Sequence, residues 1–83
     1  MIDELRKEID KLDNEIVALL DKRFDCSKAI GEEKKKIQKQ VLDQSREQII
    51  LDKVASLSTK DHAPYIQEIY KKIMEQSREY QNK

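Results

Sequence analysis

The sequence has few of the residues that interrupt helices or that stabilise small folds covalently. Its 83 residues include one glycine, one proline, one cysteine and no tryptophan. Few glycines and prolines leave few places for tight turns, and the dominance of Lys, Glu, Gln, Leu and Ile favours helix. We therefore predict an all-α chain. The single cysteine, Cys26, excludes an internal disulfide, and its place among apolar residues predicts a small buried side chain.

A surplus of charge and a long apolar run are also missing. The 17 Lys and Arg residues are balanced by 17 Asp and Glu residues. This balance argues against a general affinity for nucleic acid or a membrane surface, because both require surplus positive charge. No apolar run approaches the roughly 20 residues that span a bilayer, and the first residues are acidic, unlike the basic start of a signal peptide. We expect a cytoplasmic protein with one domain, residues 1–83.

One stretch, residues 5–30, carries an apolar stripe with helical spacing. Its members recur at intervals of four and three residues, which is typical of a helix face that packs against another helix. The stripe consists of Leu5, Ile9, Leu12, Ile16, Leu19, Arg23, Cys26 and Ile30. Arg23 is the exception, because burying a guanidinium without a partner anion costs several kcal/mol. This part of the helix face therefore meets either water or an anion.

The helix that carries this stripe is predicted to run from about residue 3 to about residue 37. Gly31 can either cap such a helix or lie inside it at a cost of about 1 kcal/mol relative to Ala. The good helix formers of residues 32–37 favour the second interpretation. The result is a helix roughly 50 Å long.

Two shorter helices are predicted after a connection at residues 38–42. Asp43 is expected to cap the second helix, which ends near Leu57. Asp61 or His62 is expected to cap the third helix, which reaches about residue 81 and has the only proline in its first turn. The apolar stripes of these helices are Ile50, Val54 and Leu57 in the second, and Ile66, Ile69 or Tyr70, and Ile73 in the third.

Neither short helix is long enough to cover the long one along its full length. With 41% charged and 5% aromatic residues, a single chain of this size also builds only a small core. We therefore expect three helices, one very long, that form an intertwined symmetric dimer in which the two long helices pack together.

Polar residues gather where the stripes predict a core. Arg23 and Lys34 are 11 residues apart, which places them within about 20° on one helix face. The other helices contribute Asp43, Arg46, Glu47, Ser77 and Gln81. Together these residues predict a pocket for a small dianionic ligand, with no nucleophile and base, no metal-ligand spacing and no glycine-rich phosphate loop. Each of them also has a simpler interpretation, as a solvated charge, a cap or a polar residue near a helix end.

Several segments, in this order and at these separations, resemble one known family. They are LRKEIDKLD at residues 5–13, ALLDKR at 18–23, IGEEK at 30–34 and DQSRE at 43–47, followed by Tyr65-Ile66, residues 75–77 and Gln81. The family is the all-helical class of chorismate mutases, and the resemblance covers nearly the whole chain. It implies an intertwined dimer of three-helix chains that converts chorismate to prephenate without a cofactor or a metal, a step of aromatic amino acid biosynthesis in the shikimate pathway.

The resemblance also implies roles for the site residues. Arg23 and, from the partner chain, Arg6 would hold the two carboxylates of chorismate. Lys34 and Gln81 would donate hydrogen bonds to its ether oxygen.

Asp43 and Glu47 would engage the region of the ring hydroxyl, and Arg46 and Ser77 would complete the polar shell. Two alternatives stay open at this point. One is an isochorismate pyruvate-lyase of the same fold, and the other is a helical dimerisation module without catalysis.

Overall fold

The computed structural model describes residues 1–83 as three helices joined by two short connections. Helix α1 comprises Ile2–Lys36, α2 Gln44–Leu57 and α3 Ala63–Gln81, and there is no strand. The predicted all-α fold is confirmed, and so are the helix bounds to within a residue or two. None of the three helices holds a stretch long and apolar enough to cross a membrane.

Local chemistry explains where each helix begins and ends. Asp3 and Glu4 lie in the first turn of α1, and three lysines lie in its last turn, so both ends suit the helix dipole. The helix passes through Gly31 without a break, as predicted, and ends where Gln38 takes a left-handed conformation with φ of 57°. The side chain of Asp43 caps α2 by accepting a hydrogen bond from the main-chain N–H of Arg46 at 3.0 Å.

The start of α3 has a different chemistry. His62 is its N-cap residue, but the side chain of His62 makes no capping hydrogen bond. Pro64 lies in the first turn, where its missing N–H leaves no helical hydrogen bond unmade.

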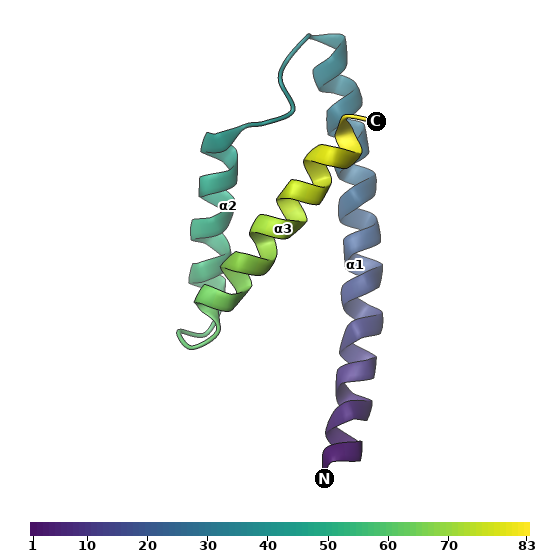
Figure 1. Ribbon diagram of the computed structural model, residues 1–83, viewed down its shortest axis with the longest axis vertical. Coiled ribbons are helices and arrows are strands. Elements are labelled where there is room, and N and C mark those ends of the chain that lie inside the picture. Colours follow the sequence, from purple (N-terminus) through teal and green to yellow (C-terminus); the bar gives the residue numbers. More distant parts are fainter.

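Helix α3 holds the fold together. It crosses diagonally between the other two helices and packs against both, whereas α1 and α2 make no helix–helix contact with each other (Figure 1). The buried residues lie on or against α3, and they are Ser27, Gly31, Val54, Met74 and Ser77. An edge-to-face contact between Phe24 and Tyr80, with ring centroids 5.8 Å apart, adds to the α1–α3 packing. On the third helix Tyr70 faces inward and Ile69 outward, which decides between the two candidates for that stripe.

The N-terminal half of α1 projects beyond the other helices and has no neighbour in the single chain (Figure 1). Its stripe is exposed, with Leu12 at 53% and Leu19 at 63% of full accessibility. Two sequence predictions are wrong for the single chain. Cys26 is exposed rather than buried, and Leu57 at the end of α2 is 74% exposed, because each lies on a helix face that no other element of the chain covers.

Candidate functional site

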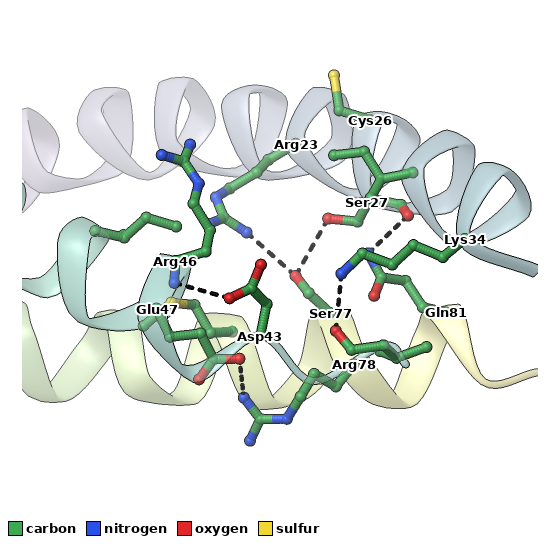
Figure 2. Close-up of a pocket in the computed structure, with 14 residues that line it drawn as sticks. Arg23, Cys26, Ser27, Lys34, Asp43, Arg46, Glu47, Ser77, Arg78 and Gln81 are labelled. Carbon is green, nitrogen blue, oxygen red and sulfur yellow. Dashed lines mark hydrogen bonds and ion pairs between the residues drawn. The ribbon is translucent and has the colours of Figure 1, made fainter. Parts of the chain in front are cut away.

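A pocket of about 260 Å³ lies where the middle of α1, the start of α2 and the C-terminal half of α3 approach one another. Figure 2 shows polar side chains from all three helices directed into it. The polar and charged residues that line it are Arg23, Ser27, Lys34, Asp43, Arg46, Glu47, Ser77, Arg78 and Gln81. Apolar side chains, among them Ile50 and Met74, form part of the wall.

Arg23 is held in place from two sides. One of its terminal nitrogens donates a hydrogen bond to Ser77 Oγ at 3.2 Å, and its guanidinium carbon lies 5.7 Å from the centre of the Tyr70 ring. Ser27 Oγ, also on α1, donates a hydrogen bond to the same Ser77 oxygen at 3.4 Å, so Ser77 contacts α1 at two points. A guanidinium has five N–H donors in one plane, so Arg23 keeps most of them for a ligand. The charge within the apolar stripe therefore faces a polar pocket.

Lys34 reaches the pocket from the last turn of α1. Its ammonium group donates a hydrogen bond to the main-chain oxygen of Val41 at 3.0 Å. The connection between α1 and α2 thus holds the amine at the pocket wall. An ammonium has three donors, and this contact uses one of them.

Gln81 lies against the backbone of α1. Its side-chain nitrogen donates a hydrogen bond to the main-chain oxygen of Ser27 at 2.8 Å. A Cβ at Gly31 would stand only 3.0 Å from both Cβ and Cγ of Gln81. The single glycine of the chain therefore allows the last turn of α3 to approach α1, and so places the Gln81 amide beside the pocket.

The start of α2 supplies both acidic side chains of the pocket. One carboxylate oxygen of Asp43 is engaged in the N-cap. Arg46, in the first turn, is exposed. Glu47 forms an ion pair with Arg78 of α3, and the side chains of both are less than one third exposed.

All of the predicted site residues except Arg6 line this one pocket. Arg6 lies on the projecting half of α1, 17 residues before Arg23, which is about 25 Å along a helix. No arginine side chain spans that distance, so Arg6 cannot reach the pocket of its own chain.

The sequence prediction missed three features of the site. Arg78 directly follows Ser77 and therefore lies off the apolar line of α3, so helical spacing did not indicate it. Ser27 lies four residues after Arg23, a spacing that could have indicated it. The carbonyl of Val41 carries no sequence signal, because any residue supplies one.

The charges favour an anionic ligand. Four cationic side chains, Arg23, Lys34, Arg46 and Arg78, line the pocket together with two carboxylates. The chain as a whole has no net charge, so the positive surplus is local. No group of three or more His, Cys, Asp or Glu side chains is arranged to hold a metal ion.

Comparison with known proteins agrees with this chemistry. Residues 5–82 match the family model described as chorismate mutase type II. A bifunctional chorismate mutase/prephenate dehydratase of Aquifex aeolicus is 44% identical over 55 residues, which are 66% of this chain and 15% of that protein. Intracellular chorismate mutases of Mycobacterium bovis and Mycobacterium tuberculosis are 43% identical over 56 residues, 68% of this chain and 53% of theirs. The chain thus spans about half the length of the mycobacterial proteins and a much smaller part of the Aquifex protein. No solved structure gave a significant match.

Proposed function

Because this chain belongs to the chorismate mutase type II family, we propose that it catalyses the rearrangement of chorismate to prephenate in the pocket between its three helices. The observation that carries the proposal is the gathering of the predicted polar residues, from three separate helices, around one pocket with surplus positive charge. A non-catalytic dimerisation module gives no reason for such a cluster, since it needs only the apolar stripe.

The proposed reaction is a Claisen rearrangement within one molecule. A C–O bond of the enolpyruvyl ether breaks while a C–C bond forms, and no group has to be protonated or attacked. The protein contributes by holding the compact reactive conformer and by stabilising the negative charge that develops on the ether oxygen. Preorganised donors suit this task, because they act more strongly on the transition state than on the ground state.

The proposed roles follow from the donors in the pocket. Arg23 binds one substrate carboxylate with the N–H groups that Ser77 does not use. Lys34 and Gln81 donate to the ether oxygen. Lys34 reaches the pocket from the last turn of α1 and Gln81 from the last residue of α3, and main-chain carbonyls orient both of them.

The remaining groups have proposed roles at the other side of the substrate. Asp43 and Glu47 engage the ring hydroxyl, while Arg46 and Ser77 complete the polar shell. Both carboxylates lie at the start of α2, so this end of the pocket suits a hydroxyl donor better than a second carboxylate.

We further propose a homodimer in which Arg6 of one chain reaches the pocket of the other. The exposed stripe on the projecting half of α1 supports this assembly, because a second copy would cover it. Arg6 lies on the same projecting half and cannot reach the pocket of its own chain. In a dimer packed along α1, it would instead lie near the pocket of the partner chain. The three helices of residues 1–83 form one catalytic domain in this proposal.

The mycobacterial relatives are named intracellular chorismate mutases, and we propose a cytoplasmic location for this chain as well. The substrate is proposed to be free chorismate.

The test is a chorismate-consumption assay on the purified chain, with identification of the product. Prephenate formation by the wild type and its near loss in Arg23→Ala, with helix content unchanged by circular dichroism, is the expected result. Release of pyruvate from isochorismate, without rearrangement of chorismate, would instead identify a lyase. A chain that neither turns over nor is thermally stabilised by chorismate would be a structural module.

A further inference from the structure

One ion pair differs from all the others in the molecule. Four ion pairs join residues three apart on the same helix, and their side chains are exposed to solvent. The pair between Glu47 and Arg78 joins α2 to α3, and its side chains are only 24% and 30% exposed. Exposed pairs contribute little, whereas a partly desolvated pair has a stronger interaction and a fixed geometry.

Both members of this pair line the proposed active-site pocket. In the view of Figure 2, Glu47 lies between the guanidinium of Arg78 on one side and those of Arg23 and Arg46 on the other. Glu47 extends from the first turn of α2, and Arg78 directly follows Ser77, whose hydroxyl accepts a hydrogen bond from Arg23. The pair thus joins the acidic end of the pocket to the helix that positions Arg23.

A carboxylate in this place creates an electrostatic conflict. The proposed substrate carries two carboxylates, and an unpaired Glu47 carboxylate in the same pocket would repel them. Pairing with a fixed cation removes most of that repulsion and still leaves lone pairs of the carboxylate for a hydroxyl group. It also prevents Glu47 from turning inward to form an ion pair with Arg23 or Arg46 and so occupy the donors meant for the substrate.

We propose that Arg78 is a positioning residue that neutralises Glu47 and holds it against α3, so that the pocket accepts a dianionic substrate. The inference rests on the proposed function of the same pocket. Arg78 acts through Glu47 and does not itself bind the substrate. Its removal therefore weakens substrate binding chiefly because it leaves Glu47 unpaired.

The experiment is a double-mutant cycle on the full chain, with KM and kcat for chorismate measured separately. Arg78→Met is expected to raise KM about tenfold, with kcat within about threefold of the wild-type value, because a half-buried charge pair is lost. Arg78→Lys keeps the cation and is expected to restore most of the affinity. In the Glu47→Gln background, where no unpaired charge can arise, Arg78→Met is expected to leave KM unchanged.

Lys72→Met is the matched control. It also removes a cation from α3, but Lys72 pairs with Glu75 on the same helix and is exposed. Its KM is expected to equal that of the wild type. Should Arg78→Met lose helix content, Arg78→Gln, which is neutral but can still donate a hydrogen bond to Glu47, takes its place with the same expected direction.

Three results would overturn the inference. They are an unchanged KM in the Arg78 variant, a loss confined to kcat, and an equal rise in KM with and without the Glu47 charge, which would mean that Arg78 binds the substrate itself. A wild-type chain without turnover would reject the proposed function as well, and the wild-type assay separates the two failures.

Discussion

Gly31 shows how one absent side chain sets the geometry of a site. The glycine lies inside α1, where glycine is unfavourable by about 1 kcal/mol relative to Ala. Its benefit is the close approach of Gln81, whose Cβ and Cγ lie 3.0 Å from where a Cβ at this position would be. Gly31 thus lowers the stability of α1 but allows the Gln81 amide to lie beside the pocket.

Gly31→Ala is expected to separate stability from activity. The gain in helix propensity offsets the displacement of Gln81, so the free energy of unfolding should stay within about 1 kcal/mol of the wild-type value. Misplacing the Gln81 amide by a few tenths of an ångström or more should lower kcat by about 10- to 100-fold. Thermal denaturation and steady-state kinetics measure the two effects. In the Gln81→Ala background the same substitution should lower kcat no further.

Lys34 offers a second prediction at this scale. Lys34→Ala removes the cation that we propose acts on the ether oxygen, and it is expected to cost about 3–4 kcal/mol of transition-state stabilisation, seen as a fall in kcat/KM of a few hundredfold or more. The matched control is the neighbouring Lys35→Ala. The exposed Lys35 ammonium donates only to the main-chain oxygen of Lys83, so its loss should leave turnover unchanged. Near wild-type turnover in Lys34→Ala would contradict the proposed role.

Helical periodicity predicted the residues of the pocket that lie on a recognisable face. Arg23 and Lys34 share a face of α1, and Ser77 and Gln81 share one of α3, so their convergence followed from the spacing. Arg78 could not be predicted in this way, because its relevance depends on where α2 lies relative to α3. The burial of Cys26 was predicted from its stripe, but no other helix of the single chain covers this part of the stripe, and Cys26 is exposed.

At the scale of the elements, the helices were predictable and their arrangement was less so. Asp43 and Pro64 are local signals, and each acts where the sequence indicated. The connection between α1 and α2 carries no comparable signal, since its left-handed residue is Gln38 rather than glycine. This connection brings the Val41 carbonyl to Lys34. Because the sequence did not predict the path of the connection, it did not predict this contact either.

The exposed stripe of α1 gives a prediction for that element. Leu12→Asp places a carboxylate in the middle of the stripe. Because a two-fold dimer contains every substitution twice, this change should weaken the proposed dimer by at least about 4 kcal/mol. Analytical ultracentrifugation should then find monomers, and activity should fall with the dimer. Asn14→Asp adds the same charge about 160–200° away around the helix and is expected to leave both properties unchanged. A dimer that survives Leu12→Asp would place the interface elsewhere.

The shape of the whole molecule is that of an open, elongated chain. Its accessible surface is 7132 Å², whereas a compact protein of 9.9 kDa has about 5,200 Å². Its radius of gyration is 15.4 Å, against about 12 Å for a compact domain of this length. The excess surface, about 1,900 Å² per chain, corresponds to an obligate interface if a second copy covers it. We expect the thermal stability to depend on protein concentration for the same reason.

Mixing two inactive variants tests the proposed sharing of Arg6. Chains with Arg6→Ala and chains with Arg23→Ala are each expected to be nearly inactive. In a mixed dimer, one site combines Arg23 of the Arg6→Ala chain with Arg6 of the Arg23→Ala chain, so it is complete. The other site lacks both arginines. After unfolding and refolding together, an equal mixture should therefore recover about a quarter of the wild-type activity.

The control for this experiment combines Arg23→Ala with Lys34→Ala. Both residues reach the pocket from the same chain, so no pairing of the two variants yields a complete site, and no recovery is expected. Recovery in the control, or none in the test mixture, would contradict the proposed contribution of Arg6 across the interface.

The absence of contact between α1 and α2 has a consequence for the bound state. The pocket lies between two helices that are linked only through α3 and one connecting segment, so a dianion held by Arg23 and Lys34 on one side and by the start of α2 on the other would act as a crosslink. Binding of the ligand and the packing of α2 against the rest of the chain would then stabilise each other. Saturation with the product should slow hydrogen exchange most in the first turns of α2, far more than in the projecting turns of α1.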